Sequence, residues 1–277
     1  MAIPSSFVSD IPHLREKTVR VGLLARAAAI FRVDEILIYR STAQADSKEA
    51  RFLKTILSYL ETPQYLRKRV FPLSQDMQYV GVLPPLRTPH HPISKASENG
   101  STAYREGIVV ASEKNWAIVE VGLADEVRLE GPSLRKATRV TVRIEKTGQG
   151  ERFSVVSREE VPFYWGYNVS VSERALGETL KQRSDELIIL TSRYGDPLLQ
   201  RMEDLKRELS EASRILVVFG SPQEGIAEIL SRERLKPLDF TDIILNMFPN
   251  QGTVTVRTEE AVYATLGILN VLEPMQE

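Results

Sequence analysis

The chain has 277 residues, a formal net charge of −1 and no cysteine. This near-neutral balance does not indicate a generally nucleic-acid-binding protein, so any RNA contact must come from local patches. The lack of cysteine excludes disulfides, thiol catalysis and cysteine-ligated zinc or iron–sulfur centres. Because no apolar run approaches about 18 residues and the N-terminus lacks the charge and hydropathy pattern of a signal peptide, we expect a cytoplasmic protein without a membrane span.

The first part of the chain alternates predicted strands and helices, which is typical of a parallel α/β sheet. Strands are expected at residues 3–8 and 33–39 because both runs are apolar and short. Helices are expected at residues 12–30, which are rich in alanine, and at residues 46–61, where apolar side chains recur at helical spacing.

The pattern changes at Pro84–Pro92, where four of nine residues are proline. Such a density is incompatible with a helix or a central strand. Short apolar or alternating runs separated by turn sequences then predict strands at 107–112, 116–123, 138–146 and 152–157. About five strands in this length have the size of a small barrel such as the OB-fold.

The α/β pattern resumes after Pro162. Strands are expected at 185–195, 214–220 and 241–248, and helices at 172–183, 196–212, 225–233 and 259–272. We therefore predict an α/β domain with a parallel sheet, assembled from both chain ends (1–86 and 160–277), with a small OB-like β-barrel inserted at 87–159.

Three predicted strands end in polar or glycine-bearing turns, at 191–195, 220–225 and 245–252. In open α/β sheets, ligands bind beyond the carboxyl ends of the strands. The phosphate-binding glycine patterns are absent, which disfavours a nucleotide-dependent enzyme. The uncharged sequence "NMFPNQG" suits an adenine or ribose better than a phosphate, although each turn is also compatible with a purely structural role.

Taken together, these turns resemble the SPOUT superfamily of S-adenosylmethionine-dependent RNA methyltransferases, in particular the archaeal and eukaryotic group with an OB-like insert. The N-terminal sequence "RVGLLARAAAIFRVDEILIY" is similar to the first motif of the ribose-methylating branch. "LVVFGSPQEGI" resembles the second motif, and "IILNMFPNQGTVTVRTEEAV" resembles the third. The resemblance covers about residues 1–85 and 160–277 together with the insert.

The resemblance implies a trefoil knot, a homodimer and a cofactor pocket formed by the three C-terminal loops. It implies an S-adenosylmethionine-dependent methyltransferase acting on structured RNA, either tRNA or rRNA, without a metal. The alternative is a non-catalytic RNA-binding protein that keeps the fold. The residues that the resemblance places around the cofactor are Thr191, Gly220, Ser221, Leu245, Asn246, Met247, Gln251, Gly252 and Thr253.

Two positions depart from the ribose-methylating pattern, since Arg20 and Thr255 stand where that branch usually has asparagine. The motif therefore supports methyl transfer better than it identifies the acceptor atom. Arg26 and Arg193 are the catalytic candidates, because a guanidinium can orient a phosphate or polarise an acceptor oxygen. The alternative interpretation of Arg26 is a side chain that points into solvent. The alternative interpretation of Arg193 is an ion pair with Asp196 or Glu224.

The insert carries a local basic bias, with seven Lys or Arg against three Asp or Glu between residues 128 and 152. Barrel faces of this kind bind oligonucleotides. A solvated face without a ligand is the alternative. His90 and His91 are interpreted as linker residues rather than metal ligands. The candidate RNA-binding residues are Arg135, Lys136, Arg139 and Arg143.

Overall fold

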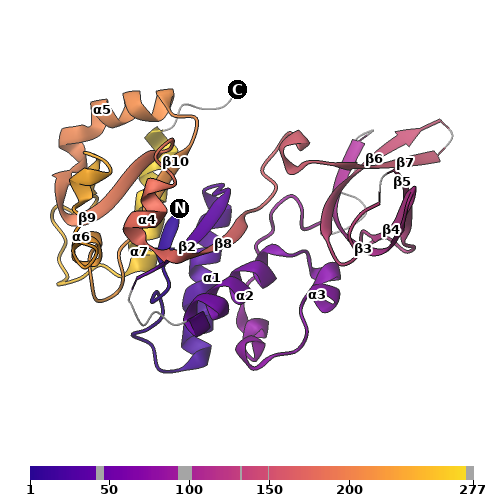
Figure 1. Cartoon of the computed structure of the whole chain (residues 1–277), viewed down its shortest axis with the longest axis horizontal. Helices are drawn as coiled ribbons and strands as arrows, with labels where there is room; N and C mark the ends of the chain where they lie inside the picture. The colour runs from indigo at the N-terminus through magenta and orange to yellow at the C-terminus, as the bar shows by residue number, and fades with distance from the viewer. Residues whose placement is uncertain (42–46, 93–101, 132, 149, 273–277) are drawn as a thin grey trace. The chain divides into compact units, whose positions relative to one another are not determined.

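The structure is a computed structural model that describes residues 1–41, 47–92, 102–131, 133–148 and 150–272. The chain divides into two compact units (Figure 1). The parallel-sheet unit comprises Met1–Ser58, Asp76–Pro84 and Tyr167–Glu277, and the antiparallel-sheet unit comprises Tyr59–Gln75 and Pro85–Gly166. No helix in the described ranges is long and apolar enough to cross a membrane.

The parallel-sheet unit contains six strands in the order β11-β9-β10-β1-β2-β8, and every pairing is parallel. The N-terminal strand β1 lies between strands from the two halves of the chain, because Ala2 pairs with both Val218 and Leu37. The predicted assembly of one sheet from both chain ends is confirmed. The strands are β1 (Ala2–Pro4), β2 (Glu35–Arg40), β8 (Asn168–Ala175), β9 (Leu187–Pro197), β10 (Ile215–Val218) and β11 (Ile244–Asn246).

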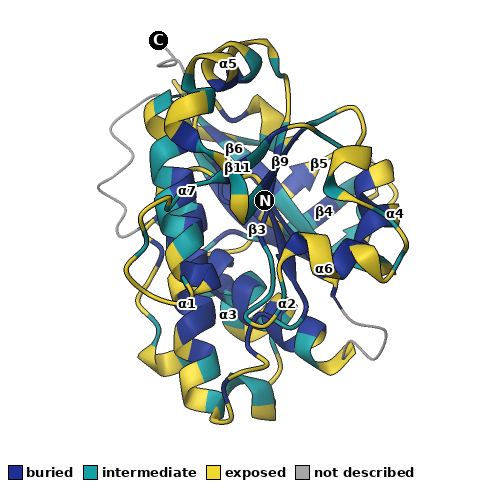
Figure 2. Cartoon of the chain, turned by 90° about the vertical axis from the view of Figure 1, so that its left-hand side faces the viewer, coloured by how far each residue is buried: buried dark blue, intermediate teal, exposed yellow. Residues whose placement is uncertain are grey.

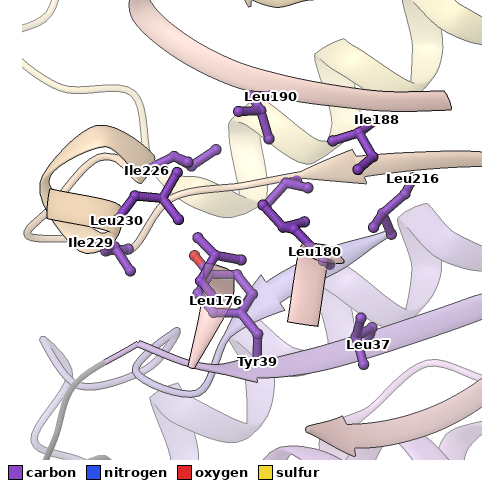
Figure 3. Packing of buried hydrophobic residues seen from close by; sticks show 12 residues of the cluster. Leu37, Tyr39, Leu176, Leu180, Ile188, Leu190, Leu216, Ile226, Ile229 and Leu230 are labelled. Carbon is purple, nitrogen blue, oxygen red and sulfur yellow. The ribbon is translucent and has the colours of Figure 1, made fainter. Parts of the chain in front are cut away.

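Helices cover both faces of this sheet (Figure 2). On one face, α4 (Leu176–Lys181) and α6 (Ile226–Ser231) pack their leucine and isoleucine side chains against the strands (Figure 3). On the other face, α1 (Leu14–Ile30) lies beside α7 (Thr258–Leu272). The strands contribute alternate side chains to the two layers, as β geometry requires. The remaining helices are α2 (Ser47–Glu61) and α5 (Leu198–Glu211).

The antiparallel-sheet unit contains five strands in the order β5-β4-β3-β6-β7. Its inward face carries the apolar core of Val109, Val119, Val142 and Ile144. The edge strands β5 and β7 come close to each other, so that the sheet is nearly closed and barrel-like. The elements are α3 (Gln64–Val70), β3 (Thr102–Glu113), β4 (Trp116–Glu120), β5 (Val127–Glu130), β6 (Arg139–Thr147) and β7 (Gly150–Val156).

Three details differ from the sequence predictions. The strand expected at 3–8 ends at Pro4, after which the chain turns. The helix expected at 172–183 is strand β8 up to Ala175 and becomes helical only from Leu176. β5 was not foreseen as a separate strand. Asp46, the expected first residue of α2, lies outside the described residues.

Candidate active site

The three strand ends singled out in the sequence lie at one edge of the parallel sheet. β11, β9 and β10 are consecutive neighbours in the sheet and run in the same direction. Side chains link their ends: Thr191 Oγ1 donates to the Val218 carbonyl oxygen at 2.8 Å, and Asn246 Nδ2 donates to the Arg193 carbonyl oxygen at 2.8 Å. The structure therefore brings the predicted loops together.

The loop after β10 is a compact turn that begins at a glycine, where a side chain would have little room. A Cβ atom at Gly220 would lie 3.0 Å from the Glu224 carbonyl oxygen, a backbone atom that cannot easily move. Ser221 closes the turn, since its N–H donates to the Glu224 carbonyl at 2.8 Å and its Oγ accepts the Glu224 N–H at 2.9 Å. Thr258, the first residue of α7, donates through Oγ1 to the Gly220 carbonyl at 3.3 Å, which ties this helix to the loop.

The loop after β11 is shaped by its own amide side chains. Asn246 Oδ1 accepts the Phe248 N–H at 2.9 Å. Gln251 Nε2 donates to the carbonyl oxygens of Thr253 at 2.8 Å and of Val254 at 3.2 Å. These bonds hold the loop without using charged groups.

The predicted cofactor residues on this loop differ in exposure. Leu245 is buried in β11, Met247 is half-buried, and Gly252 and Thr253 are exposed. A Cβ atom at Gly252 would meet no heavy atom within 4 Å. The backbone at Gly252 is therefore open to a ligand, while the side chain of Leu245 acts through packing.

Arg193 lies within β9, since the segment predicted as a turn at 191–195 is part of this strand, and its side chain contacts the loop after β11. Its Nη1 donates to the Val254 carbonyl at 3.4 Å, and its guanidinium lies 4.6 Å from the centroid of the Tyr194 ring, whose hydroxyl accepts from Nη2. The alternative partners are engaged elsewhere, since Asp196 pairs with Arg201 and Glu224 with Arg232. Arg193 is thus an exposed cation at the strand ends.

An ion-pair cluster that the sequence analysis did not foresee lies near the start of α7. Arg20 Nη1 donates to Asp10 Oδ1 at 2.5 Å, and its Nε lies 3.2 Å from Glu259 Oε1. Arg20 and Glu259 are both buried, and Glu259 Oε2 has no hydrogen-bond partner in the described ranges. The unusual residue at this position could be seen in the sequence, because Arg20 stands where the motif of the ribose-methylating branch usually has asparagine.

Arg26 lies on α1 rather than on one of the three loops. It is half-buried on α1, twelve residues beyond the first residue of that helix and therefore roughly 18 Å along its axis. It shares one helix face with Val19, Leu23 and Ile30, which are 43%, 44% and 48% exposed. Its charge acts on Tyr263 of α7, the helix whose first residue is bonded to the Gly220 carbonyl.

Arg139, a candidate RNA-binding residue, makes strong bonds inside the antiparallel-sheet unit. Its Nη1 lies 2.6 Å from Glu61 Oε2 and its Nη2 lies 2.9 Å from Glu106 Oε2. Both carboxylates are buried. Burial alone would raise the pKa of Glu61, but the hydrogen bond from His90 and the charge of Arg139 lower this pKa to about 2. Arg139 therefore neutralises two buried acids.

The other candidates on this unit are more accessible. Arg135 and Lys136 are exposed in the turn before β6, and Arg143 is half-buried and lies 3.5 Å from Glu145 Oε1. His90 and His91, which we interpreted as linker residues, both make contacts within this unit. His90 is fully buried, and each ring places Nε2 near the Glu61 carbonyl oxygen, at 2.8 and 2.6 Å respectively.

No group of three or more His, Cys, Asp or Glu side chains in the described residues could hold a metal ion. An open cleft of about 540 Å³ lies at β2, β8 and α4, near the edge of the parallel sheet that is formed by β8 rather than by β11. Its cations, Arg40, Arg174 and Lys181, are matched by Glu173, Glu178 and Glu233. This mixed charge does not define an anion site.

Comparison with known proteins identifies the class to which this arrangement belongs. A protein family described as "Putative RNA methyltransferase" matches residues 1–269. An uncharacterized protein of Halobacterium salinarum is 33% identical over 98% of both chains. The 28S rRNA (uridine-N(3))-methyltransferase of Homo sapiens is 33% identical over 97% of this chain and 77% of its own length. The Drosophila melanogaster enzyme of the same name is 28% identical over 97% of this chain and 61% of its own length.

The fold and the matches together define a methyltransferase that acts on RNA. The chain belongs to this RNA methyltransferase family, whose match covers residues 1–269 of the chain. The resemblance noted in the sequence is thereby confirmed.

Proposed function

We propose that this protein transfers a methyl group from S-adenosylmethionine to N3 of a uridine in ribosomal RNA. The observation that carries the proposal is the meeting of three polar segments at one edge of the parallel sheet, linked by Thr191 and Asn246. The acceptor follows from the similarity to the human uridine-N(3) methyltransferase. A tRNA target, and a ribose acceptor, are the outcomes that the product analysis below distinguishes.

The loops fit an adenosyl ligand in their chemistry. The open backbone at Gly252 and the main-chain groups around Asn246 can bind an adenine edge and ribose without a charged partner. When bound, S-adenosylmethionine would supply an electrophilic methyl group that needs no metal. The residues proposed to hold it are Thr191, Gly220, Ser221, Leu245, Asn246, Met247, Gln251, Gly252 and Thr253.

The protein's own groups would prepare the acceptor. N3 of uracil carries a proton that must leave before or during methyl transfer, and the negative charge then spreads over the two ring carbonyl oxygens. The exposed guanidinium of Arg193 can stabilise that charge and make the proton easier to lose to water. As the new N–CH₃ bond forms, the S–CH₃ bond breaks and S-adenosylhomocysteine leaves.

We further propose that two copies of the chain associate through the exposed apolar face of α1, which contains Leu23 and Ile30, and that this is where Arg26 acts. Such a face on an isolated chain would leave apolar surface in water. Burying it in a homodimer would place Arg26 at the contact between copies. Sedimentation should give twice the monomer mass, and Leu23→Glu should reduce it to the monomer. A monomeric wild-type protein would contradict the proposal.

The trefoil knot and the OB-like topology of the antiparallel sheet are part of the same proposal. They rest on the family resemblance, on the parallel sheet built from both chain ends and on the nearly closed five-stranded sheet.

Substitution of Gly252 tests the donor site with little effect on folding. Gly252→Ala meets no neighbouring atom, so the protein should keep its stability. We expect S-adenosylmethionine to bind at least about tenfold more weakly by calorimetry, because the new methyl group occupies space that the ligand needs. Gly81→Ala, at another glycine of the same unit with no neighbour within 4 Å, is the matched control and should bind normally.

Product analysis tests the acceptor. Total RNA incubated with the wild-type protein and labelled donor should yield labelled N3-methyluridine on nucleoside analysis, and reverse transcription should stop at the modified base because N3 lies on its pairing edge. Arg193→Ala should lower the rate without preventing donor binding. Label recovered only as 2′-O-methyl nucleoside would refute the N3 assignment, and no label at all would refute the proposed reaction.

A further inference from the structure

Tyr104 lies on the face of the antiparallel sheet that points away from its apolar core. Tyr104 of β3 pairs with Arg143 of β6, and Arg143 pairs with Ser154 of β7. Since side chains alternate along strands, these three residues share one face, opposite to the core residues Val142 and Ile144. The row therefore combines a ring, a cation and a hydroxyl.

Phe163 extends this row into an aromatic cluster. Its ring centroid lies 5.9 Å from that of Tyr104 and 5.7 Å from that of Trp165, and Tyr104 lies 6.2 Å from Trp165. Trp165 is buried, whereas Phe163 is 47% exposed and Tyr104 is half-buried. A large aromatic ring exposed on a supported cluster offers a flat surface to a ligand.

The cluster is held from beneath by hydrogen bonds. Trp165 Nε1 donates to Glu106 Oε1 at 2.5 Å, and Thr141 Oγ1 donates to the same oxygen at 3.1 Å. Glu106 is in turn paired with Arg139, which also binds Glu61. This buried network fixes the orientation of Trp165, so the rings above it are preorganised rather than mobile.

Polar atoms beside the rings have few partners. Ser154 Oγ is a buried atom with no hydrogen-bond partner in the described ranges, and Arg143 Nε has no hydrogen bond there, only an ion pair with Glu145 Oε1 at 3.5 Å. They belong to adjacent residues across β6 and β7, on the same face as Tyr104. Buried polar groups without partners are uncommon in proteins and call for a specific reason. A ligand with hydrogen-bonding groups, stacked on Phe163, would provide one.

We propose that Tyr104, Phe163, Arg143 and Ser154 form a subsite for one unpaired RNA nucleotide. The base stacks on the exposed ring of Phe163, which Tyr104 supports in an edge-to-face contact. The Arg143 guanidinium contacts a phosphate, and Ser154 bonds to the base edge or the 2′-hydroxyl. A base can present its face only when it is unpaired, so this ligand is single-stranded RNA rather than a duplex. The basic bias of residues 128–152 gives the complementary charge. The inference rests on the proposed RNA substrate and adds the chemistry of its recognition.

The experiment measures binding of the whole chain to a fluorescent oligouridylate by anisotropy. Phe163→Ala and Tyr104→Ala should each weaken binding at least about fivefold, as expected for the loss of one stacked base. The substitutions Phe163→Tyr and Tyr104→Phe keep a ring and should retain affinity. Arg143→Ala should lower the slope of log affinity against log salt by about 0.7, the value for one phosphate contact on single strands.

Matched controls separate this subsite from the fold and from the methyl transfer. Leu73→Ala removes a fully exposed apolar side chain from the same unit and should change nothing. An abasic oligonucleotide should bind wild type and Phe163→Ala equally, since it has no base to stack. If the wild type binds and methylates RNA, and the folded Phe163→Ala and Tyr104→Ala variants bind RNA with the same affinity, the subsite alone is overturned. A wild type that binds no single-stranded RNA overturns the subsite, and one that also methylates no RNA overturns the proposed function too.

Discussion

Replacement of Arg139 by alanine should destabilise the protein by about 3–5 kcal/mol, the cost of removing one partner from a buried ion pair. The reason is that Glu61 and Glu106 are both buried and lie 2.6 and 2.9 Å from the Arg139 guanidinium. Without this cation, Glu106 loses its ion pair with Arg139 and Glu61 keeps the longer one with Arg158, at 3.4 Å, so two buried carboxylates remain with less compensating charge. Arg139→Lys should recover only part of the loss, because an ammonium cannot bridge both acids as a guanidinium does.

Urea denaturation measures the effect, and its pH dependence identifies the cause. The pKa of Glu61 is lowered from its usual 4.5 to about 2, so its ionised form stabilises the fold above pH 4.5, and this contribution is lost as the pH falls toward 2. The difference between wild type and Arg139→Ala should therefore be largest above pH 4.5 and shrink in acid. Arg135→Ala, at an exposed position of the same unit, should change stability by less than about 0.5 kcal/mol. A loss below about 1 kcal/mol for Arg139→Ala would mean that the ion pairs are not structural.

Gly195→Ala should abolish binding of the methyl donor. A Cβ atom at this position would lie 2.4 Å from the Ile244 carbonyl oxygen and 2.7 Å from the Ile244 carbonyl carbon. Both are backbone atoms of β11, so the strand must move away from β9. That movement displaces Leu245 and Asn246, which begin the last of the three loops. We expect overpacking to cost about 1–3 kcal/mol of stability and donor affinity to fall below detection by calorimetry.

Gly148→Ala provides the comparison for this variant. Gly148 is an exposed glycine in the turn between β6 and β7, with no atom within 4 Å of the added methyl group. Its substitution should leave stability and donor binding as in wild type. If Gly195→Ala binds S-adenosylmethionine with wild-type affinity, the close approach of β9 and β11 does not shape the donor site.

The sequence predicted those elements whose own residues determine them. The apolar runs of β2, β9, β10 and β11 and the helical periodicity of α2, α5 and α7 are local signals, so these elements were found. The strand β8 was missed because it is the edge of the sheet and largely accessible; its sequence, NVSVSERA, passes into helix-favouring residues. Its strand geometry comes from pairing with β2, which the local sequence does not encode.

The candidate site also combines features that the local sequence determines with features that depend on contacts between distant residues. The turns at the strand ends could be predicted, because parallel neighbours place their carboxyl ends together. The partners of Arg139 could not, since Glu61 lies 78 residues away along the chain and belongs to α2. Phe163 and Trp165 follow the strands in an irregular segment, and only the folded chain shows that they pack edge-to-face against Tyr104. Local patterns reveal strand ends, while long-range pairs require the structure.

The position of β1 between β2 and β10 also determines when each unit can form during synthesis. The pairing of Ala2 with Val218 joins residues from nearly opposite ends of the chain, so a large loop must close before the central strand gains its second neighbour. The antiparallel sheet joins only strands between Thr102 and Val156, and it can fold while the C-terminal strands are still in the ribosome. We therefore expect the nascent chain to form its five-stranded sheet first and to complete its parallel sheet last, because that sheet depends on a distant contact.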